Sequence, residues 1–247
     1  MNLSIEPNER VSFKVRYEDE HLLIVDKRAR LATVPGKAHA SDTLLNGLFA
    51  HYGAKLQNVG KQREFGMMHR LDKPTSGLLL VALSPEAAEA MTELFRNREL
   101  AKFYYAITRR APAKLPTGAI NRPILEEVKK KKLARIANSG KPALTAYKLI
   151  EQSPAAALLE CRAVTGRLHQ VRVHLASIGC AILGDDLYAN PTIADAASRL
   201  MLHAHRLVFD HPLTGAKVDV RSPLPRDFVA TLKRVGINKP DVQAPAS

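Results

Sequence analysis

The segment His69–Ala82 places a single carboxylate in a turn directly before a run of apolar residues. Pro74 fixes a backbone φ angle and Gly77 tolerates a positive φ, so the chain is expected to turn here. The run Leu78–Leu83 predicts a short, fully buried strand, because it is too short to span a membrane. Asp72 is therefore expected at the mouth of a rigid element. Taken alone, an aspartate in such a turn is usually an ordinary turn residue.

The composition points to a globular protein with a polyanionic partner. The 247 residues suffice for one large domain or two small ones with a proper core. The 37 Lys and Arg against 24 Asp and Glu give a net charge of +13. Such an excess is typical of a surface that neutralises phosphates, although a basic surface without function is the alternative. Aromatic residues make up 5% with no Trp, which argues against a broad base-stacking platform.

The cysteines and the N-terminus indicate a reducing compartment. Cys161 and Cys180 suit neither a disulfide framework nor a four-thiolate zinc site, and small core residues are expected there. The first seven residues carry no basic-then-apolar signal, and the longest apolar runs are of strand length. A cytoplasmic protein without a membrane span is expected.

Hydrophobic periodicity predicts strands and helices in alternation, without repeats or a linker. Strands are expected at Val11–Val15, His21–Lys27, Phe103–Thr108, Ala143–Ile150, Ala156–Val164, Leu200–Phe209 and Lys217–Val220. Helices are expected at Leu44–Gly53 with Ser41 or Asp42 as cap, from Ser84 to near Arg98, from Gly166 to Gly179 with Arg172 and His174 on its polar face, and at Asp227–Val235.

For two sets of residues, the sequence allows a purely structural role as well as a functional one. The run Lys129, Lys130, Lys131 and Lys132 lies in a polar segment and is either a solvated loop or a nucleic-acid contact. His203 and His205 alternate on one expected strand, and His169 and His174 lie on one expected helix. No carboxylate or thiolate completes a ligand spacing around these histidines, so no metal is expected.

Five motifs in order resemble the RluA-type pseudouridine synthases. The first is His69-Arg70-Leu71-Asp72, and the second is Lys102-Phe103-Tyr104, the family's Lys-x-Tyr. Thr165–Gln170 matches the family's Thr-Gly-Arg-x-His-Gln, and the segments Ile182–Tyr188 and Arg199–Ala204 follow. The resemblance implies an α+β fold: a mixed, largely antiparallel sheet flanked by helices, with the active-site cleft across it. A single catalytic domain is expected over 15–235, with an N-terminal arm at 1–14 and a mobile tail at 236–247.

The resemblance also implies the chemistry. Uridine loses its N1–C1′ bond, the base turns, and the sugar is rejoined through C5, without redox or activated groups, so no cofactor is expected. Asp72 is the candidate for the essential carboxylate, Arg167 matches the arginine that pairs with it, and Tyr104 matches the tyrosine against the target uracil. Whether the carboxylate attacks C1′, attacks the base or abstracts a sugar proton stays open.

RNA recognition is expected to include extrusion of the uridine from its stack. Arg70 resembles the family arginine that fills the vacated space, and a structural salt bridge is its alternative. His69, Lys102, His169 and the lysine run are the other candidate RNA contacts. The loops Ala32–Gly36 and Tyr188–Pro191 resemble those of short members that modify 23S rRNA and a tRNA anticodon stem-loop and lack an S4-type domain. A monomer without such a domain is expected.

Two other function classes fit the residues less well. A catalytically inactive RNA-binding protein has little reason to keep Asp72, Tyr104 and Arg167 together. An RNA hydrolase is expected to carry paired carboxylates for a metal, and the sequence offers no such pair around the motif.

Overall fold

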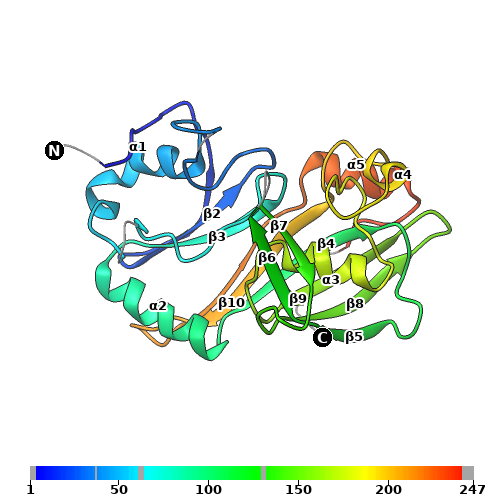
Figure 1. Cartoon of the computed structure of the whole chain (residues 1–247). Coiled ribbons are helices and arrows are strands. Elements are labelled where there is room, and N and C mark those ends of the chain that lie inside the picture. The colour runs from blue at the N-terminus through cyan, green and yellow to red at the C-terminus, as the bar shows by residue number, and fades with distance from the viewer. Residues whose placement is uncertain (1–3, 37, 61–63, 129–131, 241–247) are drawn as a thin grey trace. The chain divides into compact units, whose positions relative to one another are not determined.

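A computed structural model describes residues 4–36, 38–60, 64–128 and 132–240 (Figure 1). The chain divides into two compact units, each described by itself. The first unit comprises Met1–Leu100 and Arg206–Ser222, and the second comprises Ala101–His205 and Pro223–Ser247. In the described residues the fold is mixed α and β, and every strand pairing given below is antiparallel, as expected.

In the first unit, three strands lie side by side in the order β1-β2-β3. Their bounds are Lys14–Glu18, Leu22–Lys27 and Ser76–Ala82. Strand β11, Lys217–Arg221, pairs with the Arg206–Asp210 part of β10, Leu202–Asp210. All seven residues of β3 are buried, which confirms the predicted strand. Such a continuous apolar run is what a strand covered on both faces requires.

Two helices belong to this unit, α1 at Leu44–Leu56 and α2 at Pro85–Asn97. Helix α2 begins and ends as predicted, because the Ser84 side chain caps it and Pro85 occupies its first turn. Its Ala87, Ala88 and Met91 pack into the same core as β2 and β3. Helix α1 is capped by Thr43, not by Ser41 or Asp42, because Asn46 completes a reciprocal capping box with Thr43.

In the second unit, four strands lie in the order β4-β9-β8-β5. Their bounds are Ala101–Thr108 for β4, Ala157–Ala163 for β9, Leu144–Gln152 for β8 and Thr117–Asn121 for β5. Strands β6, Ile124–Val128, and β7, Lys132–Ile136, form a separate two-stranded sheet. The helices are α3 at Gln170–Ser177, α4 at Pro191–Ala194 and α5 at Arg226–Arg234.

The core of the second unit joins its sheet to α3 and α5. Leu158, Leu159 and Cys161 of β9 pack in one cluster with Leu175 of α3 and Phe228 of α5. Both cysteines are buried and free, as small core residues. Burial raises the pKa of the Cys180 thiol to about 11, so it is a poor nucleophile.

The prediction for α3 was wrong in two ways. The helix begins at Gln170, not Gly166, because His169 has a left-handed φ of 51° that no α-helix continues. Arg172 and His174 are buried, although the periodicity placed them on a polar face. His174 bridges Thr145 Oγ1 and the Arg122 carbonyl at 2.9 Å each, and burial lowers its pKa.

The sequence also did not predict β5, β6 and β7. Strand β5 carries one large apolar residue, Ile120, which is also its one buried residue. The sequence therefore shows no apolar alternation there, and the register of β5 depends on β8. Lys132 opens β7, whereas a solvated loop was one interpretation of the lysine run. Lys129, Lys130 and Lys131 lie outside the described residues.

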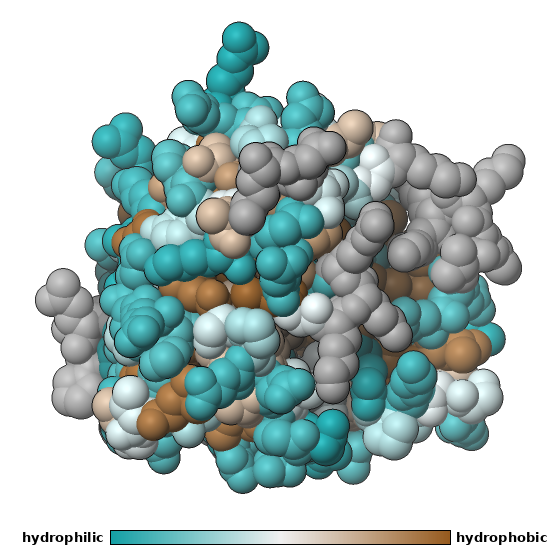
Figure 2. Space-filling view, turned by 90° about the vertical axis from the view of Figure 1, so that its left-hand side faces the viewer, coloured by the Kyte–Doolittle hydropathy of each residue, from teal (hydrophilic) through white to brown (hydrophobic). Residues whose placement is uncertain are grey.

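The surface is mostly polar on the face drawn in Figure 2, with hydrophobic residues in smaller groups among hydrophilic ones. Among the helices of the described residues, none is long and apolar enough to cross a membrane.

Gly66 is required by a close backbone approach. Its φ is +74°, and a Cβ there would lie 2.1 Å from the Ala82 carbonyl oxygen. We expect Gly66→Ala to lower the free energy of unfolding by at least about 2 kcal/mol, because backbone atoms must move. Gly36→Ala is the control, since a Cβ at Gly36 meets nothing within 4 Å. Urea unfolding of both variants measures the effect, and equal midpoints would contradict it.

Candidate active site

Asp72 lies in a tight turn that leads into β3. Its carbonyl accepts the Thr75 amide at 3.0 Å, so Lys73 and Pro74 form the centre of a four-residue turn. Gly77, the second residue of β3, has a φ of 115°, which confirms the expected positive φ. The Asp72 side chain is half-buried. The carboxylate is thus carried by a short turn on a fully buried strand and remains reachable from solvent.

Two buried side chains hold the backbone on either side of Asp72. The Lys27 ammonium is fully buried and donates to the carbonyls of Leu31 at 2.8 Å, Arg28 at 3.1 Å and Lys73 at 3.4 Å. The Thr33 hydroxyl donates to the Leu71 carbonyl at 2.7 Å, and the Leu71 amide donates to the same hydroxyl at 3.3 Å. Sequence reasoning missed both residues, since their roles depend on backbone groups far along the chain.

His69 and Arg70 precede Asp72 on the same segment. The Leu80 amide of β3 donates to His69 Nε2 at 3.0 Å, which requires an unprotonated nitrogen there. The His69 ring also lies 5.9 Å from that of Phe95 on α2. Through these contacts with β3 and α2, His69 holds the segment before Asp72 against the rest of the first unit. Arg70 is exposed.

In the second unit, Lys102 and Tyr104 occupy alternate positions of β4 and so share one face of the strand. Lys102 is buried, and this desolvation lowers its pKa to about 8. Its Nζ lies 3.5 Å from the point where a side chain at Gly166 would begin. The structure thus brings the Lys102 ammonium next to the loop that carries Arg167. Tyr104 is half-buried.

The loop 165–169 takes its shape from the buried side chain of Gln170. The amide oxygen of Gln170 accepts the Thr165 hydroxyl at 2.6 Å and the Arg167 amide at 3.1 Å. Its amide nitrogen donates to the Leu144 carbonyl at 2.9 Å and to Thr145 Oγ1 at 3.0 Å. One side chain therefore ties the loop to β8. The half-buried Arg167 directs its Nε to the Pro142 carbonyl at 3.1 Å.

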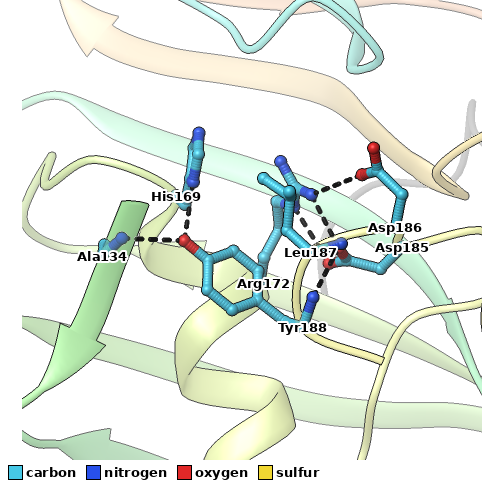
Figure 3. Close-up of polar contacts among 7 residues, drawn as sticks. All are labelled: Ala134, His169, Arg172, Asp185, Asp186, Leu187 and Tyr188. Carbon is cyan, nitrogen blue, oxygen red and sulfur yellow. Dashed lines mark hydrogen bonds and ion pairs between the residues drawn. The ribbon is translucent and has the colours of Figure 1, made fainter. Parts of the chain in front are cut away.

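His169 joins the same loop to the β6–β7 sheet through Tyr188 (Figure 3). The Tyr188 hydroxyl lies 2.7 Å from His169 Nδ1 and accepts the Ala134 amide of β7 at 3.0 Å. A non-glycine residue with a left-handed φ is uncommon, and this hydrogen bond helps to hold it. His169 thus has a structural role within its unit beside its predicted contact with RNA.

Tyr188 is placed by a buried ion pair. Arg172 of α3 donates to both carboxylate oxygens of Asp185, at 2.9 and 2.6 Å, and its guanidinium lies 5.2 Å from the centre of the Tyr188 ring. The Asp185 carboxylate also accepts the backbone amides of Leu187 and Tyr188 at 3.0 and 3.1 Å. Figure 3 shows this carboxylate at the centre of the turn. The turn therefore folds around one buried charge pair.

The two histidines of β10, His203 and His205, contact other side chains of the second unit. His205 stacks on Tyr105 with 3.8 Å between ring centres, and its Nε2 lies 2.9 Å from a carboxylate oxygen of Glu160. His203 lies beside Phe228 of the core, with 6.2 Å between ring centres. In the described part of the chain, no group of three or more His, Cys, Asp or Glu residues could hold a metal ion.

The predicted site residues therefore fall into two sets. His69, Arg70 and Asp72 share one segment of the first unit. The second unit contains Lys102, Tyr104, Arg167, His169 and Lys132. Gln170 and Tyr188 stood inside motifs that the sequence analysis singled out, but no role was predicted for either, because their partners lie on β8 and β7.

The comparison with known sequences identifies the family. A sequence model described as RNA pseudouridylate synthase matches residues 21–177, which include both the Asp72 turn and the loop 165–169. The chain belongs to this family. The synthase is 36% identical over 242 residues to the ribosomal large subunit pseudouridine synthase D of Zymomonas mobilis, covering 94% of this chain and 75% of that protein. It is 38% identical over 234 residues to the Nitrosomonas europaea protein of the same name, covering 92% and 66%.

Solved structures agree with this assignment. Human RNA Pseudouridylate Synthase Domain Containing 4 superimposes with a TM-score of 0.71 at 27% identity, covering 92% of this chain and 94% of that one. The human domain-containing protein 1 gives a TM-score of 0.70 at 26% identity, covering 92% and 90%. The fold of the synthase is therefore that of a pseudouridine synthase, and the enzyme is an isomerase acting on RNA.

We expect the Asp185 charge pair to dominate the stability of its turn. Asp185→Ala leaves Arg172 buried without its carboxylate, which should lower the free energy of unfolding by about 3–5 kcal/mol. Asp186→Ala is the matched control, because its side chain is 76% exposed and lies 3.4 Å from the same guanidinium. That change should cost no more than about 1 kcal/mol. Urea unfolding measures both, and equal losses would contradict the assignment.

Proposed function

We propose that the synthase isomerises a uridine in large-subunit rRNA, with Asp72 as its essential carboxylate. The rRNA substrate is supported by relatives at 36% and 38% identity whose names specify the ribosomal large subunit. The chain spans about two thirds to three quarters of the length of these relatives. The carboxylate is supported by one observation above all: a half-buried aspartate on a turn whose flanking peptides are held by buried side chains.

The reaction rearranges one nucleotide without a second substrate. The N1–C1′ bond breaks, a C5–C1′ bond forms, C5 loses its proton, and N1 ends protonated. A carboxylate in fixed geometry can act as a nucleophile or as a base in such a sequence. Attack on C1′, attack on the base and removal of a sugar proton remain three routes for Asp72. Tyr104 is the proposed partner of the base and the group that takes or relays the C5 proton.

Arg167 is the proposed cation of the reaction centre. Its pairing with Asp72 stays a prediction from the motif. A guanidinium suits this role, because it stays charged at all working pH values and binds carboxylates through two parallel hydrogen bonds. The hydrogen bonds from the Arg167 amide to Gln170 and from its Nε to Pro142 support a fixed approach of this side chain.

Binding of RNA is proposed to rest on the positive charge of the chain. The net charge of +13 supplies phosphate contacts, and Arg70 is the proposed residue that fills the space of the extruded uridine. Lys102, His169 and Lys129–Lys132 are the further proposed contacts. The largely hydrophilic face in Figure 2 suits a polyanionic partner. A cytoplasmic location is part of the proposal and is supported by the RNA substrate and the two free cysteines. Action as a monomer is proposed as well.

Replacement of the carboxylate tests the core of this proposal. We expect Asp72→Asn to fold and to lose activity by roughly 10³-fold or more, because the amide keeps the shape but not the charge. Tritium release from RNA containing 5-tritiated uridine measures turnover. The control is Asp210→Asn, an exposed acid in the same unit, which should retain full activity. Substantial turnover by Asp72→Asn would refute the assigned role.

The substrate class needs its own experiment. Pseudouridines are mapped in all RNAs of cells with and without the gene, and transcripts of large-subunit rRNA and of tRNA stem-loops are assayed with the purified protein. A modified position lost only from large-subunit rRNA supports the proposal. Loss of a modified position from tRNA alone would contradict large-subunit rRNA as the substrate and indicate tRNA instead.

The lysine run has a separate prediction. Replacing Lys129–Lys132 by Gln should weaken RNA binding and flatten its dependence on salt, because fewer counterions are released. The slope of log K against log salt should fall by up to about 3. The single-turnover rate at saturating RNA should stay unchanged, since phosphate contacts position the substrate. The matched control replaces the same lysines by Arg and keeps the slope. Superimposable slopes for all three proteins would show that these lysines make no phosphate contacts.

A further inference from the structure

The hydroxyl of Thr33 joins two segments that lie 38 residues apart in sequence. It donates to the Leu71 carbonyl at 2.7 Å and receives the Leu71 amide at 3.3 Å. The Thr33 side chain is 3% exposed, so water does not compete for these bonds. A buried hydroxyl that satisfies both polar groups of one residue fixes that backbone more firmly than either bond alone.

The position of Leu71 gives this contact its consequence. The Leu71 carbonyl belongs to the peptide group that enters Asp72, and a peptide group is planar. The next peptide group, which leaves Asp72, is held by the bond from the Thr75 amide to the Asp72 carbonyl at 3.0 Å. With both flanking peptide planes held, the φ and ψ angles of Asp72 are set. The direction of its Cα–Cβ bond is then set as well.

Thr33 can act as a support because its own segment is anchored. The first amides of α1, from Leu44 and Leu45, donate to the carbonyls of Ala32 and Thr33 at 2.9 and 3.0 Å. The buried Lys27 ammonium holds the Leu31 carbonyl at 2.8 Å. Threonine is also stiff about its first side-chain torsion, so its hydroxyl has few alternative positions. A chain of hydrogen bonds therefore connects the start of α1 through Thr33 to the turn of Asp72.

We propose that Thr33 is a positioning residue for Asp72. Its hydroxyl orients the peptide group that enters the aspartate, and thereby places the carboxylate against the reacting nucleotide. This inference rests on the proposed role of Asp72. It assigns a function in catalysis to the loop Ala32–Gly36, which the sequence analysis connected only with the choice of RNA.

The test compares Thr33→Val with Thr33→Ser. Valine keeps the shape of threonine without the hydroxyl, whereas serine keeps the hydroxyl without the methyl group. We expect the valine variant to lower the single-turnover rate at saturating RNA by roughly 10- to 100-fold, the range that a small misplacement of a reacting group produces. Its Kd for RNA should stay within about twofold, because the loss concerns geometry at the reacting atoms. The serine variant should recover most of the rate.

Thr108→Val is the matched control in the other unit. Thr108 is fully buried, and its hydroxyl donates to the carbonyls of Arg110 at 2.8 Å and Ala157 at 3.3 Å. The control therefore loses hydrogen bonds of the same kind without touching the Asp72 turn. We expect it to keep the wild-type rate even where its stability falls. Thr33→Cys replaces the valine variant if that protein does not fold, and an intermediate rate is expected, since a thiol bonds weakly.

A wild-type rate for Thr33→Val, or an equal rate loss in Thr108→Val, would overturn the proposal. So would a serine variant that folds but stays as slow as valine. The outcome is separable from that of the proposed function. If Asp72→Asn is active, the catalytic role of Asp72 fails, whereas an inactive Asp72→Asn beside a fully active Thr33→Val refutes only the positioning role.

Discussion

The antiparallel pairing of β2 with β3 is the constraint from which the Asp72 turn follows. Six residue pairs align the two strands, and the last pair sets Lys27 opposite Gly77 at the end where the turn enters β3. Because β3 is buried on both faces along its whole length, a shift of register would disturb close packing on both sides of the strand. The pairing therefore also determines that the Lys27 ammonium reaches the Lys73 carbonyl.

In both units, buried side chains hold a polar loop in place through hydrogen bonds, and these bonds also satisfy the buried polar groups. In the first unit, Lys27 and Thr33 bond to backbone groups beside Asp72. In the second, Gln170 bonds to the loop of Arg167, and the Asp185 carboxylate bonds to the turn of Tyr188. Each of these side chains is buried, where a hydrogen bond is strong and an unmade one is costly.

The residues that support the site differ in kind from those proposed to perform the chemistry. Asp72, Tyr104 and Arg167 are half-buried, and Arg70 is exposed, so RNA can reach them. Lys27, Thr33 and Gln170 are buried and contact mainly backbone. Such a division is expected of an active site, because groups that react must meet substrate while their geometry has to be held from behind.

The sequence by itself determined the local features: the buried strand β3, the turn with Asp72 and Gly77, the start of α2, and the motifs that carry the family resemblance. These depend on residues close together in the chain, so periodicity and turn chemistry reveal them. Only the tertiary structure decided that α3 begins after His169, that Arg172 and His174 are buried, and that β5 to β7 are strands. The supports Thr33 and Tyr188 belong to this second group, because their partners are backbone groups 38 and 54 residues away, and no local pattern records which distant amide or carbonyl a hydroxyl will meet.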